Sequence, residues 1–360
     1  MAKLGEVCLL KAGKFVSAND ISPEYNKGLY PCFGGNGMRG YVADYTHDGE
    51  FPLIGRQGAL CGNVNLASGK FHATEHAVVV QPKIEMNVHW LYYALNAMNL
   101  GQYATGAAQP GLAVSKLETL SIEIPNISEQ NKIAQTLYKV EQLVNFRKQQ
   151  LDKLDELVKA RFVEMFGDIS NSRKVPMQDV CKIITDGTHQ PPKFVLSGIP
   201  FLFVSNIVTN EIHYDAEKFI SEETYNELIK RTPIEVGDVL LSTVGSYGHP
   251  AVVKENKPFC FQRHIAYLKP NNSVVNSEYL RCAILSTDLQ RQIDESVKGI
   301  AQKTLNLSEI RKLRLPLPSL SLQNQFAAFV ERVDQQKQTV QQSLEKLELM
   351  KKALMQEYFG

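Results

Sequence analysis

The chain carries one pattern twice: SEQNKIAQTLYKVEQLVNFRKQQLDKLDELVKARFVEMFG over Ser128–Gly167, and SLQNQFAAFVERVDQQKQTVQQSLEKLELMKKALMQEYFG over Ser321–Gly360. The copies align without a gap, and the alignment extends back to Gly106 and Gly299. Matching positions are Gln109 and Gln302, Leu112 and Leu305, Ser115 and Ser308, Pro125 and Pro318, and Gln130-Asn131 and Gln323-Asn324. This internal repeat predicts two related halves.

Each copy predicts one long helix. A proline, which a helix interior does not tolerate, precedes each run, and Ser128 and Ser321 follow at candidate N-cap positions. Apolar residues recur at four- and three-residue spacing, as in a coiled-coil seam. We expect this seam to form the scaffold and to contact partner helices, with the central residues Leu137, Val144, Leu151, Leu154, Val333, Val340, Leu344 and Leu347.

Cations interrupt the seam at Arg147, Arg161, Lys337 and Lys351. A polar seam residue can fix the register and the partner of a coiled coil. A long cationic side chain can equally extend its stem along the seam and keep its charge in water. The sequence leaves both interpretations open.

The lengths of the segments predict how the helices pair. A helix of about 40 residues is a rod of about 60 Å, whereas the two ends of a domain usually lie close together. An antiparallel pair lets the intervening domain sit at one tip. The expected fold is therefore α+β: a globular α/β domain over 1–126, a helix over 127–167, a second such domain over 168–319 and a helix over 320–360, with an internal pseudo-two-fold repeat.

Composition predicts an ordinary globular protein. The 360 residues are 44% hydrophobic and 21% charged, with a net charge of +1, so that binding of nucleic acid would depend on local patches. Six scattered cysteines without a CxxC pair indicate free thiols in a reducing compartment. No run approaches membrane-spanning length, so we expect a cytoplasmic protein that does not contact a membrane.

Motifs of catalysis are missing from the sequence. There is no GxxxxGK[ST] phosphate loop and no GxSxG nucleophile elbow. The segment Gln190–Lys193 lacks the Asn/Asp-Pro-Pro-aromatic signature of amino-methyltransferases. His72 and His76 have the spacing of a metal pair, but they adjoin a strand-like run. We therefore predict neither a catalytic residue nor a metal site in this chain.

Glycine-rich turns mark the two globular domains. Tyr30–Tyr41 is dense in glycine, and these glycines either make tight turns or let the backbone approach another group closely. Phe51–Gly58 is strand-like and ends in a turn that carries Arg56, and Gly237–Gly248 takes the same place in the second half. Similarly, Phe261–Leu268 corresponds to Ala73–Val80. The outer parts of the halves differ, which predicts a duplicated scaffold with divergent loops.

These elements together resemble the specificity subunit of type I restriction–modification systems. The resemblance rests on the duplicated Gly-x-Ala-Gln…Leu…Ser…Leu…Pro…Gln-Asn element before each helix. Further elements are Tyr30-Pro31…Gly34-Gly35-Asn36-Gly37, Asp186-Gly187-Thr188-His189…Pro192, Gly198-Ile199-Pro200-Phe201…Asn206-Ile207 and Gly237-Asp238-Val239-Leu240-Leu241. It covers essentially the whole chain, in the order target-recognition domain, helix, target-recognition domain, helix.

The resemblance implies a non-catalytic reader of double-stranded DNA. Such a subunit assembles with two copies of a modification subunit, an adenine-N6 methyltransferase that uses S-adenosylmethionine. Restriction subunits, which translocate and cut DNA, complete the complex. Each domain would read one half of a bipartite target, and the helices would set the unread gap. Because the two domains differ, we expect an asymmetric target.

Candidate DNA-reading residues are polar side chains on the turns, because such side chains read base edges in the major groove. They are Asn36, Arg39, Arg56, Gln57 and Lys70 in the first domain, and His189, Lys193, Ser242, Thr243, Ser246, Tyr247 and Arg263 in the second. Gln109 and Gln302 occupy equivalent positions, so we expect shared scaffolding or phosphate contacts from them.

Two other classes of function compete with this hypothesis. A coiled-coil scaffold could space two protein-binding domains, and the near-neutral net charge favours it. An enzyme with an unrecognised active site is the third hypothesis. Salt-dependent DNA binding distinguishes the first from the second, and methyl transfer by the chain alone would favour the third.

Overall fold

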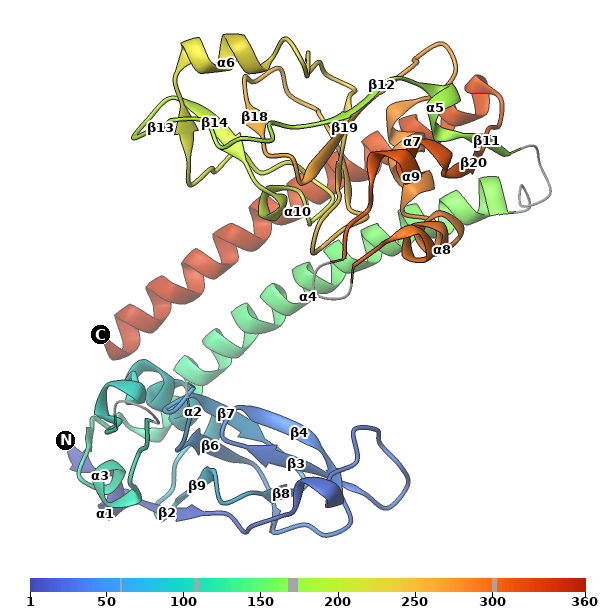
Figure 1. The fold of residues 1–360 in the computed structure, drawn as a ribbon. Helices are drawn as coiled ribbons and strands as arrows, with labels where there is room; N and C mark the ends of the chain where they lie inside the picture. The colour runs from blue at the N-terminus through green and yellow to red at the C-terminus, as the bar shows by residue number, and fades with distance from the viewer. Residues whose placement is uncertain (59, 107–109, 168–173, 300–302) are drawn as a thin grey trace. The chain divides into compact units, whose positions relative to one another are not determined.

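A computed structural model describes residues 1–58, 60–106, 110–167, 174–299 and 303–360 (Figure 1). The chain forms two compact units: unit 1 comprises 1–149 and 341–360, and unit 2 comprises 150–340. Each unit therefore contains one globular domain and a part of both long helices, α4 (Ile127–Phe166) and α10 (Leu320–Phe359). No helix among the described residues is long and apolar enough to cross a membrane.

Unit 1 is built on the antiparallel sheet β2-β9-β6-β7. A second sheet has the order β4-β3-β8-β5, and β1 pairs with β10. The strands are β1 (Ala2–Lys3), β2 (Cys8–Ala12), β3 (Tyr30–Gly34), β4 (Gly37–Val42), β5 (His47–Asp48), β6 (Phe51–Gly55), β7 (Val64–Ala67), β8 (Lys70–Ala73), β9 (Ala77–Pro82) and β10 (Ser121–Ile122). The helices are α1 (Leu4–Val7), α2 (Val88–Ala97) and α3 (Val114–Glu118), with short 3-10 turns at Ala18–Asp20 and Leu100–Tyr103.

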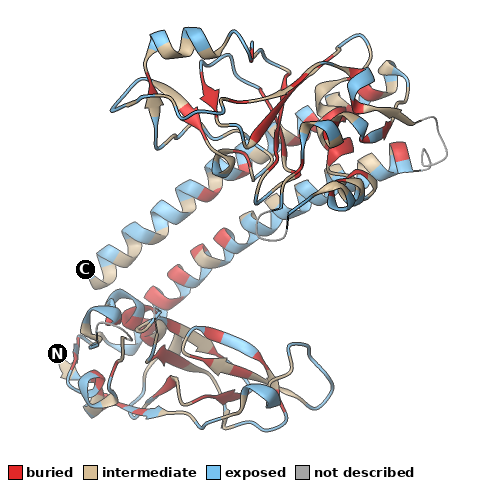
Figure 2. Cartoon of the chain, viewed as in Figure 1, coloured by how far each residue is buried: buried red, intermediate tan, exposed pale blue. Residues whose placement is uncertain are grey.

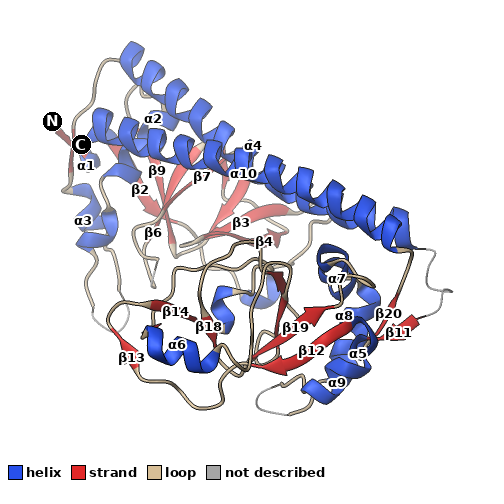
Figure 3. Ribbon diagram, turned by 90° about the horizontal axis from the view of Figure 1, so that it is seen from above, coloured by secondary structure: helices blue, strands red, loops and turns tan. Residues whose placement is uncertain are grey.

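Unit 2 repeats this plan. Its first sheet is β12-β19-β16-β17, its second is β13-β15-β14-β18, and β11 pairs with β20. The strands are β11 (Lys174–Pro176), β12 (Cys181–Asp186), β13 (Phe194–Val195), β14 (Ile199–Leu202), β15 (Phe219–Ile220), β16 (Val239–Ser242), β17 (Pro250–Val252), β18 (Cys260–Phe261), β19 (Ile265–Pro270) and β20 (Arg314–Pro316). The helices are α5 (Met177–Val180), α6 (Glu222–Leu228), α7 (Ser277–Ile284), α8 (Thr287–Ser296) and α9 (Leu307–Lys312), with a 3-10 turn at Val204–Asn206. Figure 3 shows these strands and helices by type.

The first sheet of each unit is covered on both faces. In unit 1, Ile54 and Val78 pack with Trp90 of α2 and Leu137 of α4. Other residues of the same strands, such as Leu53, form a second cluster with Phe71 of β8. Alternation along a strand explains this division, because successive side chains point to opposite faces. Figure 2 shows the buried strand positions in red.

The long helices pair antiparallel within each unit. In unit 1, Glu141 accepts a hydrogen bond from Lys351 Nζ (2.6 Å), and Arg147 Nε lies 3.2 Å from Ser343 Oγ, so the numbers run in opposite directions. In unit 2, Lys337 Nζ lies 2.9 Å from Asp155 Oδ1. The predicted α+β repeat with antiparallel helices is confirmed. Lys337 and Lys351 bind carboxylates of the opposite helix, whereas Arg161 pairs with Glu164 of its own helix, so both interpretations remain open.

The predicted scaffold residues of the two long helices are buried to different degrees. Leu137, Val144, Val333, Val340 and Leu344 are buried, and Leu151, Leu154 and Leu347 are partly buried.

The helix starts differ from the predicted caps by two residues. Asn126 Oδ1 accepts from Glu129 N–H (3.0 Å), and Ser319 Oγ lies 3.4 Å from Leu322 N. The N-caps are therefore Asn126 and Ser319, and the predicted caps Ser128 and Ser321 lie inside the helices. Both true caps directly follow a proline, which fixes where the helix can begin.

The paired Gln-Asn of the repeat attaches each helix to its own domain. Asn87 N–H donates to Gln130 Oε1 (2.9 Å), and Gln130 Nε2 donates to the carbonyl of Pro125 (2.8 Å). In unit 2, Asn276 N–H donates to Gln323 Oε1 (2.8 Å), and Gln323 Nε2 donates to the carbonyl of Pro318 (2.9 Å). The glutamines are 2% and 0% exposed. Burial explains the choice of glutamine, because a buried backbone N–H needs an acceptor.

Candidate nucleic-acid interface

Both units end their first sheet with the same backbone hydrogen bonds. Arg56, after β6, donates its N–H to the carbonyl of His76 (3.0 Å) and accepts from Leu112 N–H (2.9 Å). Thr243, after β16, donates to His264 (2.9 Å) and accepts from Leu305 (2.8 Å). Arg56 and Thr243 therefore occupy one position of the repeat, and so do His76 and His264. The sequence-based match of these segments is confirmed.

A close backbone contact also brings the loop after the first strand of the sheet to this end of the first sheet in each unit. Lys14 N–H donates to Ala73 (2.9 Å), and Thr188 N–H donates to Phe261 (3.2 Å). The preceding residues are glycines for a steric reason. A Cβ on Gly13 would lie 2.0 Å from the carbonyl oxygen of Ala73, and one on Gly187 would lie 2.2 Å from that of Phe261. These loops, which follow β2 and β12, therefore lie against the turns before β9 and β19.

Four of the five predicted readers of unit 1 lie on the turn after β3, on β4 and at the end of β6. Asn36, Arg39 and Gln57 are exposed, and Arg56 is partly buried. Asn36 Oδ1 accepts from Asn63 Nδ2 (3.2 Å), which connects the β3–β4 turn to the loop after β6. Close approach explains the glycines here, since a Cβ on Gly55 would lie 1.9 Å from the Gly35 carbonyl oxygen.

Lys70 is the exception in unit 1. It begins β8, at the opposite end of that strand from Ala73, and its ammonium lies 4.8 Å from the centre of the Tyr45 ring. The structure therefore does not bring Lys70 to the other four residues.

Unsatisfied polar atoms concentrate near this end of unit 1. Buried atoms without a hydrogen-bond partner among the described residues include Arg56 Nε, His72 Nδ1, Thr74 Oγ1, Glu75 Oε2 and His76 Nδ1. Most buried polar groups of native proteins have partners, so a cluster of orphans requires an explanation.

In unit 2, two predicted readers are buried. Ser242 and Thr243 are 0% and 5% exposed, and Ser242 Oγ accepts from His249 N–H (2.9 Å). Their side chains support the end of β16, and we leave them out of the reading surface for this reason.

The other predicted readers of unit 2 are accessible. Ser246 and Arg263 are exposed on adjoining turns, and His189 is exposed on the loop after β12. Tyr247 is partly buried and donates to Asp294 Oδ1 (3.0 Å). Lys193 is exposed just before β13. Arg263 N–H donates to the carbonyl of Thr188 (3.1 Å), which brings the His189 loop and the Arg263 turn together. Gln109 and Gln302 lie outside the described residues.

The sequence analysis missed one residue of this surface. Arg231 follows α6. Its Nη2 pairs with Asp186 Oδ1 and lies 3.5 Å from His189 Nε2. It lies 45 residues from Asp186 in the sequence, and no local pattern distinguishes it from other exposed cations.

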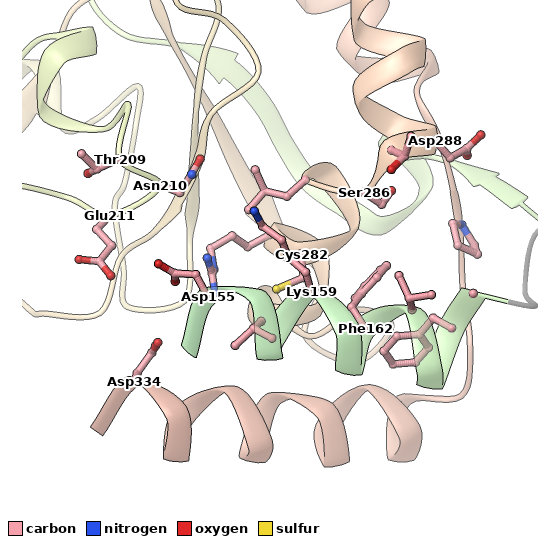
Figure 4. A pocket seen from close by; sticks show the side chains of 18 of the residues that line it. Asp155, Lys159, Phe162, Thr209, Asn210, Glu211, Cys282, Ser286, Asp288 and Asp334 are labelled. Carbon is pink, nitrogen blue, oxygen red and sulfur yellow. The ribbon is translucent and has the colours of Figure 1, made fainter. Parts of the chain in front are cut away.

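A cavity of about 580 Å³ lies elsewhere in unit 2, between α4, α7 and the loop around Asn210 (Figure 4). Phe162 and Cys282 line it. Tyr93 occupies the position of Cys282 in unit 1, six residues after the capping asparagine, and donates to Glu141 (2.9 Å). Burial raises the pKa of the Cys282 thiol to about 11, which makes it a poor nucleophile.

Metal ligands do not gather in the described parts of the chain, where no group of three or more His, Cys, Asp or Glu is placed to hold an ion. His72 Nε2 lies 3.2 Å from the carbonyl of Lys14, and His76 Nε2 lies 3.2 Å from Glu75 Oε1. All six cysteines are unpaired.

Comparisons with known proteins agree with this duplicated architecture. The model of the family described as "Type I restriction modification DNA specificity domain" matches residues 1–156 and again 170–349. The chain is 52% identical over 143 residues to the type I restriction enzyme EcoprrI specificity subunit of Escherichia coli, a match that covers 39% of this chain and 36% of that relative. It is 24% identical over 334 residues to a putative type I specificity subunit of Haemophilus influenzae, covering 85% and 80%.

The fold also matches solved structures. The S subunit of a type I restriction–modification system from M. genitalium superposes with a TM-score of 0.66 at 18% identity, covering 99% of this chain and 95% of that one. The sequence-based identification is confirmed: the chain belongs to the family of type I restriction–modification DNA specificity subunits.

Proposed function

We propose that this chain is the DNA-recognition subunit of a type I restriction–modification complex and reads a bipartite, asymmetric target, one half with each unit. The observation that carries the proposal is the repeated sheet end with different side chains. Lys14 stands where unit 2 has Thr188, and Glu75 stands where unit 2 has Arg263. Two equivalent surfaces with different donors and acceptors suit two different half-targets.

In this proposal the chain reads and its partners catalyse. Two copies of a modification subunit carry S-adenosylmethionine and methylate adenine-N6, and restriction subunits cut unmodified DNA. The complex works in the cytoplasm. Large exposed apolar side chains on the long helices favour protein partners, notably Phe146 (60%), Val163 (64%) and Leu349 (69%).

The test is genome-wide adenine methylation by single-molecule sequencing. The chain is co-expressed with its neighbouring methyltransferase gene, and the methyltransferase alone is the control. We expect a gapped, two-part adenine motif only when the chain is present. A soluble assembled complex that adds no motif would overturn the proposal.

The second candidate is a scaffold that spaces two protein-binding domains, favoured by the net charge of +1. Phosphate contacts release counterions, so that affinity of a DNA reader falls steeply with salt. We expect the assembled complex to show this salt dependence on DNA, whereas a protein scaffold would show no DNA binding to titrate.

A further inference from the structure

Asp186, the last residue of β12, holds two cation-forming side chains at once. Its side chain is only 14% exposed, and its Oδ2 lies 2.9 Å from His189 Nε2. Its Oδ1 accepts from Arg231 Nη2 at 2.5 Å. Both carboxylate oxygens are therefore engaged, one with each side chain.

Arg231 and His189 remain half exposed while they are held. Their side chains are 52% and 55% exposed, and Arg231 Nη2 lies 3.5 Å from His189 Nε2. The next residue, Thr232, is buried, with 5% of its surface exposed. An arginine that is oriented in advance loses less rotamer entropy when it binds. Nη2 makes all of these contacts, to Asp186 Oδ1, to His189 Nε2 and, at 3.5 Å, to Thr185 Oγ1. A ligand that pairs with two guanidinium nitrogens therefore uses Nη1 together with the Nη2 hydrogen that the two 3.5 Å contacts hold only weakly.

This group adjoins the other accessible residues of the unit 2 surface. Arg263 N–H donates to the carbonyl of Thr188, between Asp186 and His189. The counterpart of Asp186 in unit 1 is Ala12, because Gly13 and Gly187 occupy one position of the repeat. The arrangement therefore belongs to one half of the molecule, as a determinant of one half-target must.

We infer that Arg231, oriented by Asp186 and flanked by His189, reads a guanine in the half-target of unit 2. Guanine offers O6 and N7 as adjacent acceptors in the major groove, and an arginine fork pairs with both. Asp186 is a positioning residue, since it acts through Arg231. This inference rests on the proposed function and names one specificity determinant within it.

The test compares methylation motifs of the co-expressed complex for the wild-type chain, Arg231→Ala, Arg231→Lys and Asp186→Asn. We expect Arg231→Ala to reduce discrimination about 10- to 100-fold at one guanine of one half-target, leaving the other half unchanged. Arg231→Lys keeps the charge but loses the fork, so it should relax the same position. Asp186→Asn should relax that position more weakly.

Lys230→Ala is the matched control. It removes another exposed positive charge one residue away, without the contact to Asp186, so the motif should stay intact. The unaffected half-target reports that each variant folds and assembles.

Two results would overturn the inference. The first is a uniform loss of affinity in Arg231→Ala that Arg231→Lys restores, with a smaller salt slope, since this pattern marks a phosphate contact. The second is an unchanged motif in every variant. Failure of the proposed function is distinguishable, because the wild-type chain would then specify no motif.

Discussion

The end of the first sheet has the same backbone hydrogen bonds in both units but carries different side chains. The same hydrogen bonds close the end of each first sheet, yet the equivalent side chains differ in charge. The equivalent pairs are Ala12 and Asp186, Lys14 and Thr188, Arg56 and Thr243, and Glu75 and Arg263. These shared hydrogen bonds join backbone groups, so the bonds themselves form with different side chains at the same positions. A duplicated frame can therefore acquire two specificities without a change of fold.

The second sheets differ more deeply. Both contain one parallel pair, β3 with β8 and β14 with β18. In unit 1, β3 pairs next with β4 across a short turn at Gly35-Asn36. In unit 2, β14 pairs next with β15, which follows a longer connection. The parallel pair is therefore common to both units, whereas its antiparallel neighbours differ.

The largest effect is expected from exchange of a whole domain. Residues 1–126 are replaced by the corresponding domain of another family member, with Asn87 retained because its side chain caps α2 and donates to Asn131 Oδ1. We expect the bases of one half-target to change completely and the other half to stay the same, because each unit has its own reading surface. Single-molecule sequencing of the methylated genome measures both halves.

Exchange of 174–319 is the reciprocal control and should change the opposite half. A domain exchange that altered both halves would show that the units do not read independently.

The next effect concerns the attachment that the units share. Gln130→Leu leaves a backbone N–H and a carbonyl without partners in a buried place, which costs roughly 2–4 kcal/mol of the free energy of unfolding. Gln323→Leu should cost a similar amount in unit 2, because its hydrogen bonds are equivalent. Urea denaturation of the purified chain measures both.

Asn131→Ala serves as the control for this pair. Its hydrogen bond with Asn87 Nδ2 is exposed, so that water replaces it and the loss stays below about 1 kcal/mol. If Gln130→Leu were no more costly than Asn131→Ala, the buried glutamine would not be the attachment point.

Much of the frame was predictable from sequence because it follows from repeats and periodicity. The helices, at 127–166 and 320–359, match the predicted spans to within a residue at each end. The predicted N-caps were wrong because each proline is followed by two residues that carry a side-chain oxygen. The spacing of the sequence does not reveal which of the two oxygens accepts from the free backbone N–H groups of the first helical turn. The antiparallel pairing followed from chain length alone.

The reading surface was less predictable, because it depends on burial and on distant contacts. The sequence analysis predicted that Ser242 and Thr243 contact DNA. Ser242 ends β16, whose four residues are all buried, and the buried Thr243 follows it directly. Arg231 was not predicted because it lies 45 residues from Asp186 in the sequence, and only the fold brings the two side chains together. Polar residues on a turn therefore predict where a binding surface lies better than they predict which individual residues belong to it.

The smallest expected effect is the difference in coupling energy between two ion pairs that join the long helices, one through Lys351 and one through Lys337. Glu141 and Lys351 in unit 1 are 27% and 33% exposed, whereas Asp155 and Lys337 in unit 2 are 55% and 23% exposed. Because solvent weakens exposed pairs, alanine double-mutant cycles should give a coupling of about 1 kcal/mol for the first pair and about 0.5 kcal/mol for the second. Lys148 and Glu348, at 56% and 49% exposure, should couple by close to zero. Equal coupling in all three cycles would mean that burial does not set the strength of these pairs, and that the cations occupy the seam without selecting its register.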